Sequence, residues 1–231
     1  MGRSNTTFSP ARTSGPPSRT SRRPRQTVLR LFLLQARPEY GWLSEETADT
    51  PERMEKKRVF VVVPIDGTRG FINGDERWCV SIAVVEAGRP IAGVLMVPVQ
   101  GRLMAASLGG GATCDGKPMA ASDNPFGEAA LINGPQSWLD GNSFRSVRAR
   151  GADYVPSLAY RFAQVGLGEI DAAFSKPNAH DWDLAACDLL VHEAGGRLTD
   201  LQESAPQYNR AALKHGILVA GNAVAQPQLV R

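Results

Sequence analysis

Apolar runs and alternating apolar and polar positions mark out short strands after residue 57. The run RVFVVV at 58–63 is rich in β-branched residues and ends at Pro64, which is typical of a buried strand. Residues 78–85 and 91–97 are two further strand-like stretches, and the sequence EAGRP between them predicts a hairpin turn. We therefore expect these three strands to be neighbours in one sheet.

The second half of the chain mixes strand-like and helix-like patterns. The strand-like stretches are 129–132, 170–174 and 217–220, and the stretches with helical spacing are 157–165 and 183–194. Strands mixed with helices in this order predict a layered α/β or α+β fold rather than a helical bundle or a barrel. We expect residues 129–220 to form a second set of layers.

The N-terminal segment differs in composition from the rest. Residues 1–26 are rich in Ser, Thr, Pro and Arg, so they cannot bury enough apolar surface to offset the entropy cost of ordering. The pattern at 27–35 could form one helix that ends before Arg37. We divide the chain into a disordered basic tail, residues 1–38, and one domain, residues 39–231. The domain has two halves, residues 39–125 and residues 126–231.

Three interpretations of this tail remain open. It could be a genuine disordered N-terminus, or an organellar transit peptide, which is also rich in Arg and Ser and free of acids. The prolines at 10, 16, 17 and 24 argue against the amphipathic helix that a transit peptide needs. We favour the third interpretation, in which the start or reading frame is altered ahead of a genuine domain.

The formal charge of +3 is unevenly distributed along the chain. Residues 1–38 hold eight Arg and no acid, so the remainder carries 18 basic and 23 acidic side chains. A nucleic-acid-binding surface needs Lys and Arg clustered on folded elements, and no such cluster lies outside the tail. No apolar run approaches the ~20 residues that span a bilayer. We therefore expect neither a nucleic-acid partner nor a membrane partner.

The cysteines and histidines give no sign of a metal or disulfide site. Neither set shows metal-ligand spacing, and three dispersed cysteines are typical of a reduced cytoplasmic protein. These residues are Cys79, Cys114 and Cys187, with His180, His192 and His215. We interpret the histidines as structural and expect a cytoplasmic location.

Three acidic residues stand at the ends of expected elements. Glu45 lies in the sequence GWLSEE, Asp66 follows the strand at 58–63, and Asp183 begins a helix in HDWDL. Taken singly, each could be a loop carboxylate or a helix cap. Together they supply the oxygen ligands that a hard cation such as Mg2+ prefers.

These positions carry a resemblance to a known family. The motifs SEE at 44–46, PIDGT at 64–68 and WD at 182–183 resemble, in that order, the signature set of the inositol monophosphatase superfamily. The resemblance runs from about Gly41 to the C-terminus. It implies a layered α-β-α-β-α sandwich and a Mg2+-dependent phosphomonoesterase that acts on a small phosphorylated metabolite.

Other stretches resemble one branch of the superfamily, the 3'(2'),5'-bisphosphate nucleotidases. They are RGFING at 69–74, WCVSI at 78–82 and SKPN at 175–178. The resemblance makes adenosine 3',5'-bisphosphate or a related nucleotide the expected substrate, with inositol monophosphate as the other candidate.

The resemblance also assigns metal ligands. Glu45 would hold the first metal ion and polarise the attacking water, and Asp66 would bridge two ions. The carbonyl of Ile65 would complete one ligand set, and Asp183 would hold the second ion beside the leaving group. The implied chemistry is metal-assisted hydrolysis, in which one ion generates hydroxide and the other stabilises the leaving oxygen.

Substrate contacts follow from the same resemblance. The hydroxyl of Thr68 would orient the nucleophilic water, and the backbone N–H groups of Gly67 and Thr68 would hold the phosphate. Ser157 and Lys176 would contact the substrate, as would Asp183.

The chain departs from the family pattern at two places. Val63 stands where the family has an aspartate that ligates both metal ions, and valine offers no lone pair. Loss of a supporting partner alone typically costs 10–100-fold in metal affinity or activity, so we expect impaired activity. The paired N-terminal helices of the family are expected to be largely missing, which would uncover apolar surface and favour pairing with another chain, such as a homodimer. Two alternatives to an active enzyme stay open: an inactive phosphate-binding module and a non-functional remnant.

Overall fold

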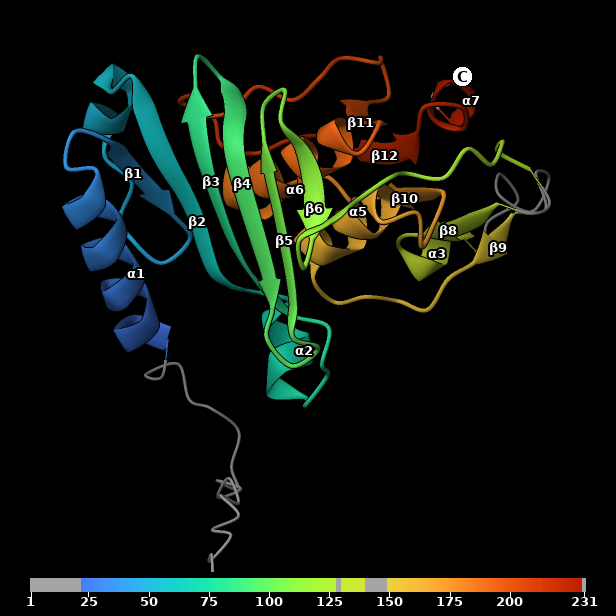
Figure 1. Ribbon diagram of the computed structural model, residues 1–231, viewed down its shortest axis with the longest axis horizontal. Helices are drawn as coiled ribbons and strands as arrows, with labels where there is room; N and C mark the ends of the chain where they lie inside the picture. Colours follow the sequence, from blue (N-terminus) through green and yellow to red (C-terminus); the bar gives the residue numbers. More distant parts are fainter. Residues whose placement is uncertain (1–21, 128–129, 140–148, 230–231) are drawn as a thin grey trace, which may run out of the picture.

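The computed structural model describes residues 22–127, 130–139 and 149–229 (Figure 1). Helices α5 and α6 lie between a seven-stranded and a five-stranded sheet, while α1 packs against the first sheet and α7 against the second. This arrangement confirms the layered α-β-α-β-α sandwich expected from the sequence. No helix of the described part of the chain is long and apolar enough to cross a membrane.

The seven strands of the larger sheet follow one another in space in chain order. The β1–β2 pair is parallel and all other neighbours are antiparallel. The three strands predicted to be neighbours are β2, β3 and β4, so that prediction is confirmed. The strands are β1 Gly41–Ser44, β2 Arg58–Asp66, β3 Cys79–Glu86, β4 Arg89–Val97, β5 Arg102–Ser107, β6 Gly111–Cys114 and β7 Lys117–Pro118.

The smaller sheet has the strand order β11-β12-β10-β8-β9 and mixes parallel with antiparallel pairs. Three of its strands, β8, β10 and β12, overlap the predicted stretches at 129–132, 170–174 and 217–220. Strand β11 is not among the strand-like stretches identified in the sequence; it begins two residues after the predicted helical stretch at 183–194. The strands are β8 Leu131–Asn133, β9 Arg150–Gly151, β10 Ala172–Phe174, β11 Gly196–Asp200 and β12 Leu218–Asn222.

Helix α6 is the centre of the core. It contacts strands of both sheets, and its residues Leu184 to Val191 are all buried. A helix that is buried on nearly all sides over two turns is expected in such a position between layers. The helical elements are α1 Arg22–Ala36, η2 Pro51–Glu55, α2 Thr68–Ile72, α3 Gln136–Leu139, α5 Leu158–Gly166, α6 Asp181–Glu193 and α7 Gln226–Leu229.

Helix α1 corrects the prediction of a tail disordered over residues 1–38. Residues 22–36 are helical, because apolar side chains in the 28–34 stretch pack toward β2 and Arg30 lies over the ring of Trp42, 6.0 Å from its centroid. Pro24 falls in the first turn, where a missing N–H costs nothing. The expected helix at 27–35 is thereby confirmed, while residues 1–21 lie outside the described part of the chain.

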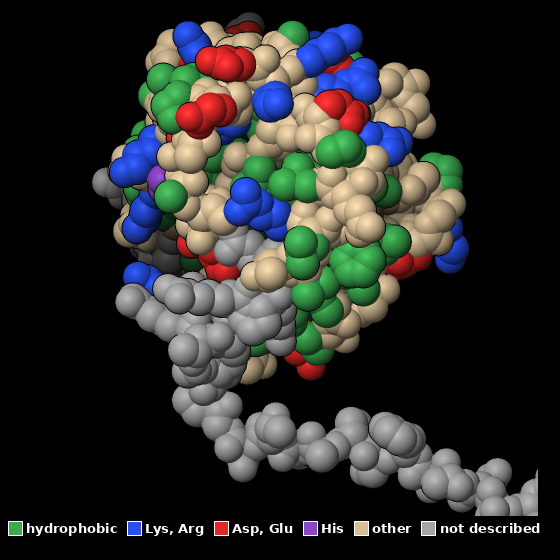
Figure 2. All heavy atoms as spheres, turned by 90° about the vertical axis from the view of Figure 1, so that its left-hand side faces the viewer, with side chains coloured by type: hydrophobic (Ala, Val, Ile, Leu, Met, Phe, Trp, Pro, Cys, Tyr) green, Lys and Arg blue, Asp and Glu red, His purple; other side chains and the backbone are tan. Residues whose placement is uncertain are grey.

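Apolar side chains remain on the surface beside α1. Figure 2 shows this side of the molecule, where apolar groups gather next to Lys and Arg. Val28, Leu31 and Phe32 of α1 are each more than half exposed. Exposed apolar surface of this kind favours association, so pairing with a second copy of the chain stays a prediction.

Candidate functional site

The three acidic residues singled out in the sequence line one cavity of about 480 Å³. They come from different elements: Glu45 follows β1, Asp66 ends β2, and Asp183 lies in the first turn of α6. Three more expected residues line the same cavity, together with six that were not expected. The former are Ile65, Gly67 and Thr68, and the latter are Arg69, Gly70, Asn73, Asp75, Tyr154 and Pro156.

An irregularity at the end of β2 aims Asp66 into this cavity. Val63 pairs with Ser81 and Asp66 pairs with Cys79, so β2 has one more residue than β3 between these two pairs. Such a bulge bends a strand and turns its side chains, and bulges are frequent beside active sites. The chain then turns at Gly67, whose φ of 83° is left-handed, and enters α2.

Gly67 is required at this turn by space as well as by conformation. A Cβ atom built on Gly67 would lie 2.9 Å from the backbone nitrogen of Ser157. The close approach brings the start of α5 against the loop that carries Asp66. No larger residue fits here without moving one of the two.

Replacing Gly67 with Ala is therefore expected to destabilise the fold strongly. The left-handed conformation alone costs an L-residue about 1–2 kcal/mol, and the clash with Ser157 adds about 1–3 kcal/mol. Gly74→Ala is the matched control, because Gly74 has a similar φ of 76° but open space around its Cβ position. Urea unfolding of both variants measures the difference, and equal losses of unfolding free energy would contradict the role of the close approach.

Asp66 is held from behind by the N-terminal end of α5. Its Oδ2 accepts a hydrogen bond from the Ser157 hydroxyl at 2.5 Å and another from the Ala159 N–H at 2.8 Å. Burial raises the pKa of Asp66, and these hydrogen bonds act against that rise. The carboxylate is thus fixed in orientation and poorly solvated, which suits a ligand more than a surface charge.

Asp183 has both a structural and an electrostatic role. Its Oδ2 accepts the backbone N–H of His180 at 2.9 Å, so the side chain helps to cap α6 while it lines the cavity. Burial raises the pKa of Asp183 to about 8, and the nearby charges of Asp66 and Glu45 contribute to the rise. Three carboxylates therefore face a space in which their charges repel one another, and a bound cation would remove that repulsion.

The turn between β2 and α2 presents polar backbone groups and a hydroxyl. Thr68 opens α2, and its Oγ1 donates to the carbonyl oxygen of Ile65 at 3.1 Å. The first N–H groups of a helix have no acceptor within the helix, so those at the start of α2 are suited to anion oxygens. Arg69 adds a positive side chain to the same wall of the cavity.

Two residues expected to contact the substrate lie away from the cavity wall. Ser157 is fully buried, donates to Asp66 and accepts from the Tyr160 N–H, because it is the N-cap of α5. Lys176 is exposed just after β10 and is not among the lining residues. The position of Ser157 is that of a support for Asp66 rather than of a substrate contact.

The chemistry of the lining groups fits a hard divalent cation. Carboxylates and a backbone carbonyl form an oxygen-only donor set of the kind that Mg2+ prefers. In the described residues, however, no group of three or more His, Cys, Asp or Glu side chains is gathered closely enough to hold a metal ion. The buried Val63, which is only 1% exposed, offers no donor at the position where the resemblance calls for a bridging aspartate. The donor atoms are therefore of the chemical type that Mg2+ prefers, but they do not form a complete set of ligands.

One wall of the cavity is formed by residues that the sequence did not predict as part of the site. Tyr154 is 53% exposed, and its ring lies 4.7 Å from the guanidinium carbon of Arg161. Arg161 itself is buried and donates twice to the carbonyl of Val155, which fixes the segment ahead of α5. This wall comes from a part of the chain about 90 residues beyond Asp66, and only the fold brings the two together.

The chain is similar to known proteins in sequence and in fold. Residues 16–231 match the Inositol monophosphatase family. An inositol-1-monophosphatase of Mesorhizobium japonicum is 32% identical over 208 residues, covering 86% of this chain and 76% of the relative. A histidinol-phosphatase of Mycobacterium tuberculosis is 33% identical over 205 residues, covering 84% and 78%. The crystal structure of extragenic suppressor protein suhB from Bartonella henselae superposes with a TM-score of 0.78 at 29% identity, covering 92% of this chain and 87% of that one.

Proposed function

This chain belongs to the inositol monophosphatase family of metal-dependent phosphatases, and we propose that it uses Mg2+ to hydrolyse a 3'(2'),5'-bisphosphate nucleotide. Adenosine 3',5'-bisphosphate is the first candidate substrate and inositol monophosphate the second. The observation that carries the proposal is the meeting of Glu45, Asp66 and Asp183 in one cavity from three separate elements. Carboxylates that share one cavity repel one another, and a bound cation would relieve this repulsion in place of the proton that the raised pKa of Asp183 allows.

The residues around the cavity divide the work of hydrolysis. Glu45, Asp66, Asp183 and the carbonyl of Ile65 would hold the cation, which when bound activates water and neutralises charge on the phosphate. Thr68 stands beside the expected ligand Ile65, where its hydroxyl would orient the attacking water.

The phosphate of the substrate would be held at the same turn. Backbone N–H groups of Gly67 and Thr68 would bind phosphate oxygens at the start of α2. Arg69 would add charge to phosphate binding, and the half-exposed ring of Tyr154 would offer a flat surface to the rest of the substrate.

Phosphate release from a substrate panel tests the proposal. The panel holds adenosine 3',5'-bisphosphate, inositol 1-phosphate and the amino alcohol phosphate histidinol phosphate. Each is assayed with Mg2+ and with EDTA. We expect Mg2+-dependent release, fastest for the bisphosphate nucleotide and slow in absolute terms because of Val63. Release that is unaffected by EDTA would contradict the metal chemistry, and a preference for the amino alcohol phosphate would contradict the proposed substrate.

A further inference from the structure

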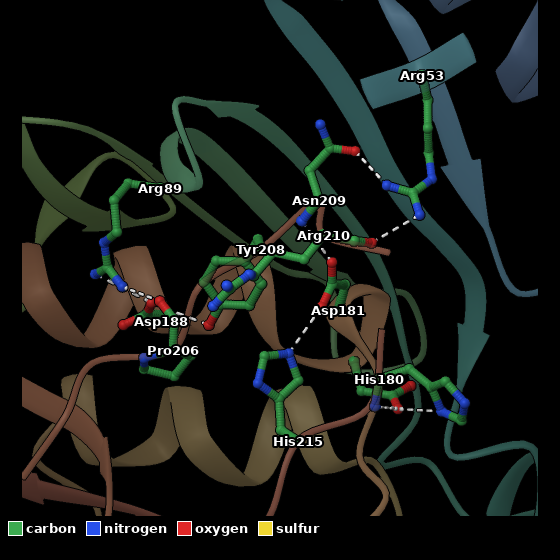
Figure 3. Close-up of polar contacts among 11 residues, drawn as sticks. Arg53, Arg89, His180, Asp181, Asp188, Pro206, Tyr208, Asn209, Arg210 and His215 are labelled. Carbon is green, nitrogen blue, oxygen red and sulfur yellow. Dashed lines mark hydrogen bonds and ion pairs between the residues drawn. The ribbon is translucent and has the colours of Figure 1, made fainter. Parts of the chain in front are cut away.

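The segment 201–217, between β11 and β12, contacts two other parts of the chain. One of them follows Glu45, and the other carries Asp183. Figure 3 shows side chains from this segment meeting Arg53 of η2 and the first turn of α6. Glu45 lies ahead of η2 and Asp183 lies in that first turn. The contacts form a continuous polar chain that none of the roles described above uses.

Asp181 links the segment to α6. It is the first residue of the helix and is completely buried. Its Oδ1 lies 2.7 Å from Nε2 of His215, and its Oδ2 accepts the backbone N–H of Asn209 at 2.7 Å. The Asp181 backbone N–H also donates to the carbonyl of Leu213 at 3.1 Å. The start of α6 is thus fixed at three points, and Asp183 follows two residues later.

Arg53 links the same segment to the part of the chain that carries Glu45. Its side chain is only 2% exposed and is held in a fork by both carboxylate oxygens of Asp49, at 2.6 and 3.0 Å. It also donates to Oδ1 of Asn209 at 2.6 Å and to the carbonyl of Arg210 at 2.9 Å. Asp49 lies four residues after Glu45, on the loop that joins β1 to η2.

Asn209 is the junction of the two links. Its side chain accepts from Arg53 and its backbone donates to Asp181, so one residue connects both parts of the chain. It has a φ of 58°, in the left-handed region that Asn tolerates better than most residues. We propose that Asn209 is a positioning residue, which sets the separation of Glu45 and Asp183 across the cavity through Arg53 and Asp181.

A second anchor of the same segment provides the contrast. The Tyr208 hydroxyl donates to Oδ2 of Asp188 at 3.0 Å, and Asp188 pairs with Arg89 at 3.2 Å. These contacts tie the segment to the middle of α6 and to β4, and they touch neither the Glu45 loop nor the first turn of α6. Tyr208 is only 1% exposed, whereas Asn209 is partly buried, so loss of the Tyr208 hydroxyl measures the general loosening that follows when a better buried anchor of the same segment is weakened.

The test compares Asn209→Gly with Tyr208→Phe by hydrogen exchange of the metal-free protein. Asn209→Gly keeps the left-handed backbone and its N–H but removes the acceptor for Arg53. We expect amides at 45–55 to exchange at least about tenfold faster in Asn209→Gly, since a hydrogen bond to a charged donor is lost. In Tyr208→Phe the increase should fall on the 201–217 segment and the β3–β4 turn, with 45–55 unchanged.

The functional consequence rests on the proposed function, and a second measurement tests it separately. In a Val63→Asp background, Asn209→Gly should weaken Mn2+ binding about tenfold, whereas Tyr208→Phe should leave it within about twofold. Unchanged exchange at 45–55 in Asn209→Gly, or an equal increase in both variants, would overturn the positioning role. Faster exchange without weaker Mn2+ binding would also overturn it. Absence of Mn2+ binding in the Val63→Asp parent would instead contradict the proposed function, while exchange still decides the link.

Discussion

Restoring an aspartate at position 63 is expected to raise Mg2+-dependent phosphate release by at least about 100-fold. Loss of a group that merely supports a ligand costs 10–100-fold, and a bridging ligand should cost more. Val63 lies in β2 on the other side of the bulge from Asp66, at the position where the family resemblance calls for a bridging aspartate. The gap in the ligand shell would thereby be closed.

The same substitution is expected to lower the stability of the metal-free protein. A carboxylate at a site that is 1% exposed cannot be solvated, and the charge of Asp66 disfavours its ionisation. Mg2+ should therefore raise the melting temperature of Val63→Asp much more than that of the parent chain. Ligand binding to the folded state alone produces such a shift.

Val63→Asn is the control, because it adds a polar group of the same size without the charge or the second carboxylate oxygen. It should destabilise the protein with little gain of activity and little response to Mg2+. If the parent chain already turns over phosphate esters as fast as Val63→Asp, position 63 is not a metal-ligand position. If Val63→Asp binds Mg2+ but remains inactive, the phosphate-binding module becomes the better description of the chain.

The strands of the larger sheet could be predicted because their signals are local. RVFVVV at 58–63 is apolar on both faces and becomes β2, which is buried along nearly all its length. The turn residues between β3 and β4 fix a hairpin within one stretch of chain. The acidic residues followed from the motifs, and each lies at an element end, as expected for a site aimed by a rigid scaffold.

What could not be predicted depends on contacts between distant parts of the chain. The composition of residues 1–26 indicates disorder, yet α1 begins at Arg22 because later apolar residues find a surface near β2. The family resemblance puts a substrate contact at Ser157. Only the packing of α5 on the β2 end shows that its hydroxyl is used by Asp66.

The polar network around Asn209 had even less signal in the sequence. His215 and Asp181 are separated by 34 positions, and Arg53 and Asn209 by 156. Each residue alone reads as an ordinary loop or helix-end side chain. Interpreting the histidines as structural is consistent with the contact that His215 makes, but the partner could be identified only from the fold.

Replacing Asp183 with Asn is expected to have opposite effects on activity and on stability. In the Val63→Asp background, phosphate release should fall by at least about 100-fold, since a neutral amide is a poor ligand for a hard cation and the charge near the leaving group is lost. The metal-free protein should become more stable at pH 8. The amide oxygen can still accept the His180 N–H, while the repulsion with Asp66 and Glu45 disappears.

The pH dependence follows from the sign of the pKa shift. The pKa of Asp183 is raised from 3.8 to about 8, so the folded state holds a proton that the unfolded chain has already released. The stability gained from that proton is full below about pH 4 and is lost as the pH rises toward 8. Unfolding free energy of the metal-free parent should therefore decline over this window, and the decline should be smaller in Asp183→Asn.

Asp200→Asn separates this effect from the general consequence of the substitution. Asp200 also accepts backbone N–H groups, from Gln202 and Ser204, but it lies outside the cavity. Its replacement should give no gain at pH 8. Chemical unfolding at pH 5 and pH 8, with EDTA and with Mg2+, measures all three proteins. A loss of stability in metal-free Asp183→Asn at pH 8 would show that capping of α6 outweighs repulsion among the carboxylates. In that case the crowding of charge would no longer argue for a cation in the cavity.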